Sequence, residues 1–413
     1  MARIAIIGAG ISGLSAAHLL SLNHDVVVYE KEMTPGGLIR CKRVNGSLYH
    51  ICGGHVFNSK RKDVLDWFWS FFDKDKEFIK ANRNSVVFME NGLRIPYPIE
   101  NHSYMFDECI QKNIIRDWIS IEKMGKESKI DNFEDFLKFR FGETLYELYF
   151  KPYNEKIWRR NLAQVPLTWL EGKLPMPTVE EMIYNNMNHI EEKKFVHSSF
   201  YYERNNGSQF IADRLSEGID VRYDSNIENV TLKDNKWCIC GEKYDKVVFC
   251  GNIKQLPSLL GDKLEGFIND INKLESHGTT SVFCEIDNNP YSWIYQPSGK
   301  HKSHRIICTG NFSPSNNSEG KMTGSIEFTD YISVDDINRD LSLMPLNPKY
   351  IDHKFNNFTY PIQDKNTRLM IKSLKDKLKT YGFYMTGRFA DWEYYNMDAA
   401  IGASMDMVNA NNI

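Results

Sequence analysis

The sequence predicts an α/β fold with a parallel sheet, an inserted helical lobe and an antiparallel sheet. Residues 2–20 run from an aliphatic strand through a glycine-rich turn into a helix. Residues 103–190 have mainly helical periodicity, and residues 278–332 contain four short runs typical of an antiparallel sheet. With 413 residues, of which 42% are hydrophobic, the chain is long enough for two or three lobes around one large core.

The N-terminal unit carries a glycine-rich loop between its first strand and its first helix. Gly8, Gly10 and Gly13 have the spacing G-x-G-x-x-G. The first glycine permits the tight turn, the second lets a pyrophosphate approach the backbone at the helix N-terminus, and the third lets helix and strand pack closely. A second predicted strand, residues 25–29, ends at Glu30, whose carboxylate is placed to accept from ribose hydroxyls. A lone glycine motif indicates only a turn, but this combination predicts a Rossmann-type, dinucleotide-binding unit.

A second glycine pair, Gly36 and Gly37, follows Glu30 and favours a resident FAD over a consumed NAD. The pair resembles the second fingerprint of the large FAD family that includes the amine oxidases, although Pro-Gly-Gly is also strong turn chemistry by itself. The cofactor-binding residues that the two motifs predict are Gly8, Gly10, Ile11, Ser12, Gly13, Glu30, Lys31, Gly36, Gly37 and Leu38.

Composition and charge exclude several classes of partner. The net charge is −3 with acids and bases interspersed, so no nucleic-acid or membrane surface is indicated. The first strand begins too early for a signal peptide, and no apolar run is long enough to span a membrane. The eight cysteines are scattered, without metal-ligand spacing, and several lie in apolar runs. We therefore expect a reduced, cytoplasmic protein without a metal.

Further elements follow along the chain. Residues 63–78 predict an aromatic-rich helix, and residues 85–97 a β-hairpin with Asn91-Gly92 as a two-residue turn. Residues 227–230 are predicted as a strand, and residues 244–251 as the strand that rejoins the nucleotide-binding sheet. The predicted domains are a discontinuous FAD-binding domain (1–80, 208–265 and 365–413), a helical substrate lobe (103–190) and an antiparallel substrate domain (81–102, 195–207 and 270–364).

The closing segment joins a predicted strand, residues 382–388, to a helix that starts near Met397. In flavin oxidases a helix N-terminus at this point faces the pyrimidine edge of the flavin, where its dipole stabilises a reduced, anionic flavin. Arg388 is predicted to add positive charge there or to bind the FAD pyrophosphate. Gly387, Arg388 and Met397 thus complete the predicted cofactor site, and a surface turn with aromatic packing is the alternative.

The closing segment, together with several earlier segments, resembles the UDP-galactopyranose mutases. Residues 387–398 are similar to their closing motif, and residues 358–362 to their Tyr-Pro-Ile segment. Residues 150–158 resemble their Tyr-x-x-Lys-x-Trp element, with Leu174-Pro175 downstream, and residues 53–57 their Gly-Pro-His-Ile-Phe stretch. These segments occur in family order over nearly the whole chain.

The resemblance implies a set of site residues. Arg305, Tyr360 and Tyr394 would grip a diphosphate, for which a bidentate cation and phenol donors are suited. His55 is either a polar neighbour of the flavin or a packed structural histidine. The implied catalytic residues are His55, Arg305, Tyr360 and Tyr394, and the implied substrate-binding residues are Asn82, Tyr153, Trp158, Lys173 and Asn396.

Three positions depart from the family pattern and indicate a divergent branch. Asn58 stands where the family has a second histidine, and Asn396 where it has an acid. Lys173 stands where the family has its second diphosphate arginine, unless Arg159 or Arg160 supplies that cation. Lysine cannot make the bidentate fork, so the sugar nucleotide need not be UDP-galactose.

The implied function is a nucleotide-sugar mutase. Reduced FAD would attack the anomeric carbon through N5 and expel the nucleoside diphosphate. The flavin–sugar adduct would open through an iminium ion and reclose with a different ring size, and the diphosphate would then return; such a product would serve polysaccharide biosynthesis. NAD(P)H or another reductant would supply the electrons, and the oligomeric state, a homo-oligomer included, stays open. The alternatives are an FAD-dependent oxidase, dehydrogenase or desaturase of the amine-oxidase type and, third, a non-enzymatic flavin-binding protein.

Overall fold

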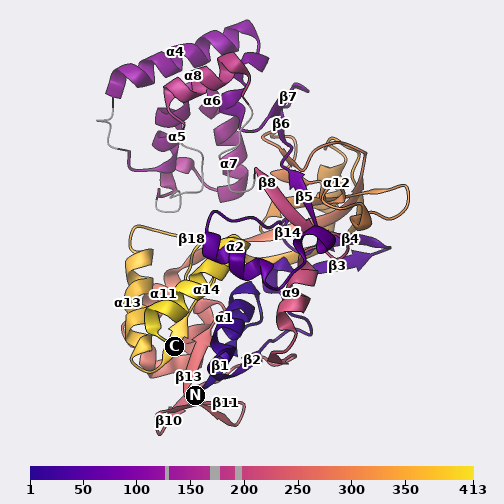
Figure 1. Cartoon of the computed structure of the whole chain (residues 1–413). Helices are drawn as coiled ribbons and strands as arrows, with labels where there is room; N and C mark the ends of the chain where they lie inside the picture. The colour runs from indigo at the N-terminus through magenta and orange to yellow at the C-terminus, as the bar shows by residue number, and fades with distance from the viewer. Residues whose placement is uncertain (126–129, 168–176, 191–197) are drawn as a thin grey trace.

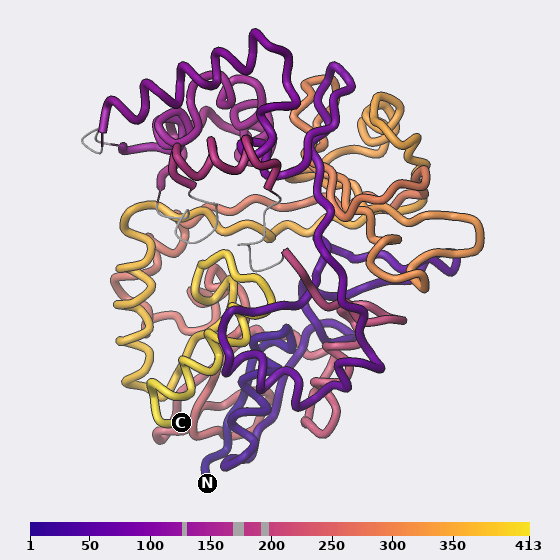
Figure 2. The backbone as a smooth tube through the Cα atoms, turned by 45° about the horizontal axis from the view of Figure 1, so that its top comes forward, coloured from indigo at the N-terminus to yellow at the C-terminus, as the bar shows by residue number. Residues whose placement is uncertain are grey.

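The computed structural model describes residues 1–125, 130–167, 177–190 and 198–413. A parallel sheet with its helices lies near both termini, a long antiparallel sheet crosses the middle of the molecule, and a helical lobe lies at the opposite end (Figure 1). The tube view shows the lobe above the long strands of the antiparallel sheet (Figure 2). The α/β fold predicted from the sequence is therefore confirmed.

The parallel sheet combines strands from the start, middle and end of the chain, in the order β19-β13-β1-β2-β9. Alternate residues of β1 are buried on its two faces, with Ile4 and Ile6 in one core and Ala5 and Ile7 in the other. Helices must therefore cover both faces, as parallel sheets require. The strands are β1 (Arg3–Ile7), β2 (Asp25–Tyr29), β9 (Asp220–Arg222), β13 (Lys246–Phe249) and β19 (Phe383–Met385).

Two sets of elements cover this sheet. On one face lie α1 (Ile11–Ser21), α2 (Lys62–Trp69), α9 (Ser208–Ser216) and α14 (Met397–Asn411). On the other lie α10 (Leu256–Leu260), α11 (Ile268–Lys273), α13 (Thr367–Lys379) and a small sheet of β10 (Thr231–Lys233), β11 (Lys236–Ile239) and β12 (Glu242–Tyr244). The helices α1 and α14 pack against each other, and Ser404 of α14 donates to the Ser12 carbonyl near the start of α1.

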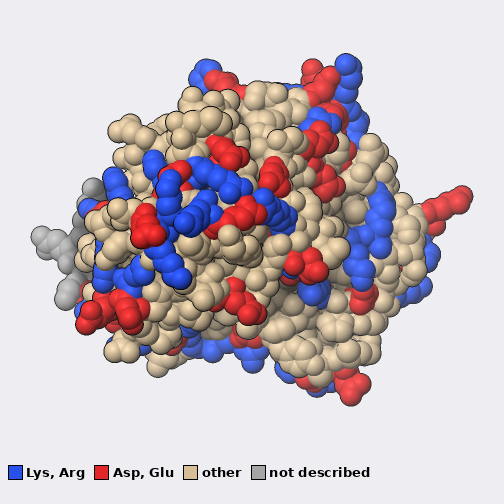
Figure 3. Space-filling view, turned by 90° about the horizontal axis from the view of Figure 1, so that it is seen from below, with Lys and Arg blue, Asp and Glu red and all other residues tan. Residues whose placement is uncertain are grey.

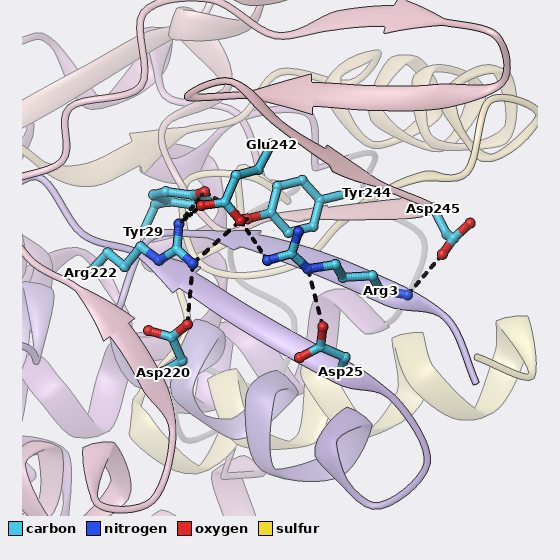
Figure 4. Close-up of polar contacts among 8 residues, drawn as sticks. All are labelled: Arg3, Asp25, Tyr29, Asp220, Arg222, Glu242, Tyr244 and Asp245. Carbon is cyan, nitrogen blue, oxygen red and sulfur yellow. Dashed lines mark hydrogen bonds and ion pairs between the residues drawn. The ribbon is translucent and has the colours of Figure 1, made fainter.

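A charged cluster fastens the small sheet to the parallel sheet (Figure 4). Glu242 accepts hydrogen bonds from both Arg3 and Arg222, which lower its pKa to about 2, Arg222 most strongly. The hydroxyls of Tyr29 and Tyr244 lie 2.7 Å apart beside it. The charged side chains are about one-third exposed, so water screens the pairs, and the cluster orients strands more than it stabilises them.

The large sheet has the order β18-β14-β17-β16-β15-β6-β7 and is antiparallel except at β15·β6. One face carries the helical lobe, and the other packs against α12 (Val334–Leu341). Its strands are β6 (Ser85–Phe88), β7 (Arg94–Pro96), β14 (Glu275–Ile286), β15 (Trp293–Tyr295), β16 (Arg305–Ile307), β17 (Met322–Thr329) and β18 (Lys349–Ile362).

The remaining elements are the lobe and two short hairpin-like pairs. The lobe contains α4 (Glu108–Met124), α5 (Phe133–Phe141), α6 (Glu143–Leu145), a π-helical turn (Tyr146–Phe150), α7 (Lys151–Trp158) and α8 (Val179–Asn188). The pairs are β3 (Cys41–Val44) with β4 (Ser47–His50), and β5 (Phe78–Asn82) with β8 (Ser199–Glu203), and α3 (Lys74–Glu77) precedes β5.

Three local predictions are wrong. The helix predicted over residues 63–78 ends at Trp69, because the Asp73 side chain caps a separate short helix. The hairpin loop has three residues between the Met89–Leu93 pair, since Gly92 adopts a left-handed φ of 88° that suits a three-residue turn. Residues 227–230 form no strand, and pairing starts only at β10.

Charged side chains of both signs share the face that Figure 3 draws. Seen from below, lysine and arginine side chains lie among acidic ones on that face (Figure 3), and the net charge of the chain is −3. In the part of the chain that the structure describes, no helix has both the length and the apolar character needed to cross a membrane.

Candidate functional site

A cavity of about 790 Å³ runs from the glycine loop at the edge of the parallel sheet to the polar face of the antiparallel sheet. That volume is in the range of sites for large organic ligands. Its lining contains most of the predicted site residues: Gly8, Gly10, Ile11, Ser12, Gly13, Glu30, Lys31, Gly36, Gly37, Leu38, His55, Arg305, Tyr360, Arg388, Tyr394, Asn396 and Met397. The two motifs at the ends of the sequence and the tyrosines between them therefore meet in one space.

The glycine loop is shaped by close packing rather than by flexibility alone. A Cβ on Gly13 would lie 1.9 Å from the carbonyl oxygen of Gly8, so only glycine fits between helix and strand. By contrast, a Cβ on Gly10 would meet nothing closer than 4.0 Å, because its backbone borders the cavity. The amides at the N-terminus of α1 thus border the cavity, which is the arrangement that binds phosphate.

Glu30 lines the same end of the cavity as the glycine loop. Its carboxylate accepts hydrogen bonds from the backbone amides of Ala9 at 2.7 Å and Glu32 at 3.0 Å. These bonds fix its position and leave acceptor capacity for hydroxyl groups. Gly36 bridges to Gly10 in parallel, so the second glycine pair lies directly against the loop. This geometry suits the ribose and pyrophosphate of a dinucleotide.

A second helix N-terminus faces the cavity from the closing segment. Met397 begins α14, and Ser404 of that helix donates to the Ser12 carbonyl at 3.0 Å, which ties α14 to α1. Arg388 lies 4.1 Å above the ring of Tyr394 and donates to the carbonyl of Tyr395. Two positive helix ends and one guanidinium therefore border the same space, which favours anionic ligand groups.

Arg305 and Glu327 form a buried ion pair on the polar face of the antiparallel sheet. The two residues are direct partners on β16 and β17, and Nε of Arg305 donates to Oε2 of Glu327 at 2.5 Å. Glu327 is 1% exposed and Arg305 19%. Burial alone would raise the pKa of Glu327, but the guanidinium holds it well below its usual range. Arg305 therefore borders the cavity with much of its charge already compensated.

The two tyrosines stand beside this pair. Nη2 of Arg305 donates to the Tyr360 hydroxyl at 3.3 Å. Tyr360 stacks on Tyr394 with ring centroids 5.4 Å apart and planes within 6°. Because Arg388 lies over both rings, the four side chains form one block with phenol hydroxyls beside a guanidinium. Such a block can donate several hydrogen bonds to phosphate oxygens.

The residues present fit a flavin dinucleotide. Nε2 of His55 and Nε of Arg388 are buried without a hydrogen-bond partner among the described residues, and buried polar atoms of this kind are normally satisfied. Burial, and then Arg388, lower the pKa of His55 to about 4, so its imidazole is neutral at pH 7. The described residues contain no group of three His, Cys, Asp or Glu side chains arranged to hold a metal ion.

Some predicted residues do not line the cavity. Asn82 is exposed at the end of β5, and Trp158 is buried in the lobe core. Tyr153 packs between the lobe and the face of the sheet that carries Arg305, edge-on to Tyr295 with ring centroids 5.5 Å apart. Gly387 lies just outside, with φ 115° and its Cβ direction against Ser12. Lys173, with the Leu174-Pro175 pair, falls outside the described residues.

The departure at Asn58 has a structural role. Its side chain donates to the Ser199 carbonyl at 2.7 Å and so joins this segment to β8. The two arginines predicted as alternatives to Lys173 make other contacts: Arg159 donates to the Thr329 carbonyl, and Arg160 pairs with Glu275. None of the three lines the cavity.

Sequence reasoning missed Arg83, Trp293 and Glu327. Arg83 and Trp293 line the cavity, and Glu327 lies beside Arg305 on the adjacent strand. Signals existed, since Arg83 follows Asn82 and Glu327 interrupts an apolar strand. What the sequence lacked was the register that brings these strands together.

Comparisons with known proteins agree with this geometry. A family described as NAD(P)-binding Rossmann-like domain matches residues 6–74. The UDP-galactopyranose mutase of Mycoplasma genitalium is 22% identical over 96% of this chain and 92% of its own length. A crystal structure of reduced UDP-galactopyranose mutase superposes with a TM-score of 0.86 at 22% identity, covering 99% of this chain and 96% of that one.

Oxidases are also similar, but their sequences align over less of the chain. The L-amino-acid oxidase of Daboia russelii is 36% identical over 22% of this chain and 18% of its own length. In sequence, the oxidase similarity is limited to one part of the molecule, whereas the mutase of Mycoplasma genitalium aligns over 96% of the chain. A structure of putrescine oxidase also covers 99% of this chain, but with a TM-score of 0.63 and 14% identity, so it shares the fold. Along nearly its whole length, the chain is a distant relative of the UDP-galactopyranose mutases, and the resemblance carried by its motifs is confirmed.

Proposed function

We propose that the chain is a flavin-dependent mutase that interconverts the pyranose and furanose forms of a nucleotide sugar. The observation that carries the proposal is that Arg305, Tyr360 and Tyr394 meet in the same cavity as the glycine loop. A dehydrogenase or oxidase needs the cofactor loop but has no need for a block of phosphate donors. The isomerase class follows from the full-length relatives, which carry the mutase name.

In this proposal FAD is the cofactor, held by the predicted cofactor residues at the loop and at α14. When bound and reduced, it would supply the nucleophile that displaces the nucleoside diphosphate from the sugar. The positive end of α14 and Arg388 stabilise negative charge at that position. FAD is preferred to the NAD(P) of the family description because Gly36 and Gly37 lie directly against the first loop.

The protein's own task is to hold the substrate. Arg305, Tyr360 and Tyr394 bind the diphosphate as it leaves and keep it in place for return, which raises its effective concentration. His55 is neutral at pH 7, so it offers a hydrogen bond rather than a charge. The other predicted substrate residues remain proposals: Asn82, Tyr153, Trp158, Lys173 and Asn396.

The division of the chain into three domains and its cytoplasmic location also remain proposals.

The test is incubation of dithionite-reduced protein with a panel of nucleotide sugars, followed by chromatography of the pyranose and furanose products. Ring interconversion that depends on reduction supports the mutase. Activity only with oxidised protein, together with release of hydrogen peroxide, would instead establish an oxidase of the amine-oxidase type.

A further inference from the structure

Arg83 is a cation of the cavity that is held on an aromatic platform. Its guanidinium carbon lies 4.6 Å from the ring centroid of Trp293, within the range of a cation–π contact. Nε donates to the Ser85 hydroxyl at 2.7 Å, and Nη2 donates to the Tyr295 hydroxyl. These two bonds commit two of the five N–H groups of an arginine, so donors remain for a ligand.

The charge of Arg83 is not compensated in the way that the charge of Arg305 is. Its described partners are a hydroxyl, a phenol and an indole ring, and none of the described acids forms an ion pair with it. Arg305, in contrast, pairs with the buried carboxylate of Glu327. A doubly charged diphosphate therefore needs positive charge from a residue other than Arg305.

Strand register places Arg83 near the diphosphate block. Trp293 of β15 is opposite Ser85 of β6, and Tyr295 is opposite Arg305 of β16. Residues opposite each other across a sheet have Cβ atoms about 5 Å apart and share one face. Tyr295 thus lies between the two arginines, and both arginines and Trp293 line the same cavity.

We propose that Arg83, supported on Trp293, is a phosphate-binding residue of the substrate site and supplies its uncompensated positive charge. The proposal rests on the proposed function and deepens it, since the ligand class is a nucleoside diphosphate attached to a sugar. Stacking fixes the plane of the guanidinium, which lets it present paired donors to phosphate oxygens at small entropic cost. Lys173 is then not needed as the second diphosphate cation.

The experiment measures binding of UDP, GDP and dTDP to the flavin-loaded protein by calorimetry. Arg83→Gln should weaken binding of the best nucleotide roughly 10- to 100-fold, the effect of one or two charge-assisted hydrogen bonds. The affinity of Arg83→Lys should lie between those of the wild type and Arg83→Gln, because lysine keeps the positive charge but cannot donate two parallel hydrogen bonds. The matched control is Arg94→Gln, which removes an arginine stacked on Phe88 with a 4.7 Å separation and outside the large cavity.

The outcomes separate the inference from the function on which it rests. Loss of affinity in Arg83→Gln, with unchanged flavin content and an unchanged Arg94→Gln, supports the proposal. Wild-type affinity in Arg83→Gln overturns it, as does loss of flavin and of thermal stability in both Arg83 variants, which would make Arg83 a structural residue. If the wild-type protein binds none of the three nucleotides, the proposed nucleotide-sugar function itself is refuted.

Discussion

Replacing Glu327 with glutamine tests whether the ion pair with Arg305 builds the polar end of the cavity. Removing one partner of a buried pair leaves the other charge uncompensated, at a typical cost of about 3–5 kcal/mol. Arg305 is 19% exposed and also contacts Tyr360, so water and the phenol recover part of that cost. We therefore expect a loss in unfolding free energy of about 3 kcal/mol, the lower end of the range.

The assay is urea denaturation of the flavin-loaded protein, with the midpoint and slope of each variant compared. Glu285→Gln is the matched control, because Glu285 lies in the same sheet and pairs with Lys321, whose side chain is 48% exposed. That open pair should contribute less than about 1 kcal/mol. Equal losses in the two variants would refute the reasoning, since burial would then have no influence on the cost.

The same pair predicts the direction of a pH effect. Because Arg305 lowers the pKa of Glu327 in the folded protein below its ordinary value of 4.5, the stabilisation is present above pH 4.5 and is lost as the pH falls. The glutamine side chain of Glu327→Gln takes up no proton in this range, so the stability of the variant should decline less steeply in acid than that of the wild type. Thermal melts across the acidic range measure this difference.

Three further predictions concern the loop, a buried lysine and the diphosphate block. Gly13→Ala should abolish flavin retention because its Cβ would meet the Gly8 carbonyl, whereas Gly299→Ala, with open space around it, should keep flavin absorbance. Burial lowers the pKa of Lys156 from 10.5 to about 7. Between these two pH values the folded protein has released a proton that the unfolded chain retains. The free energy of unfolding of the wild type, relative to Lys156→Met, should therefore rise with pH in this range by up to about 1.4 kcal/mol per pH unit, as measured by urea denaturation. Arg305→Lys should lower kcat/KM for the nucleotide sugar roughly tenfold or more, mainly through KM, because lysine cannot donate in a bidentate fork; an unchanged KM in steady-state assays would count against the clamp.

The cofactor end of the cavity could be predicted from the sequence because its chemistry is local. The loop from Gly8 to Gly13, the acid at Glu30 and the pair at Gly36 lie within the first 37 residues, in one strand–helix–strand unit, and contact one another there. Every one of them lines the cavity. The strand order could not be derived in the same way, since β13 and β19 join β1 from positions far along the chain.

The substrate end was harder to predict because it depends on register. Asn82 is one of the predicted substrate residues; its side chain is exposed, whereas the adjacent Arg83 lines the cavity. Successive residues of an extended chain point to opposite sides, so neighbouring positions of one segment can lie in solvent and in the cavity. Glu327 was missed for a related reason, since only the pairing of β16 with β17 places it against Arg305.

Charge balance also bears on the choice between a mutase and an amine oxidase. Arg83 and Arg388 line the cavity without an acidic partner among the described residues, whereas Arg305 is paired with the buried carboxylate of Glu327. An amine substrate would bring a further positive charge against these arginines, whereas a diphosphate would neutralise them. Asn396, where the related mutases have an acid, adds no negative charge to the lining. The asparagine at position 396 therefore leaves the cavity better suited to anionic ligands, which is a reason to test several nucleoside diphosphates rather than UDP alone.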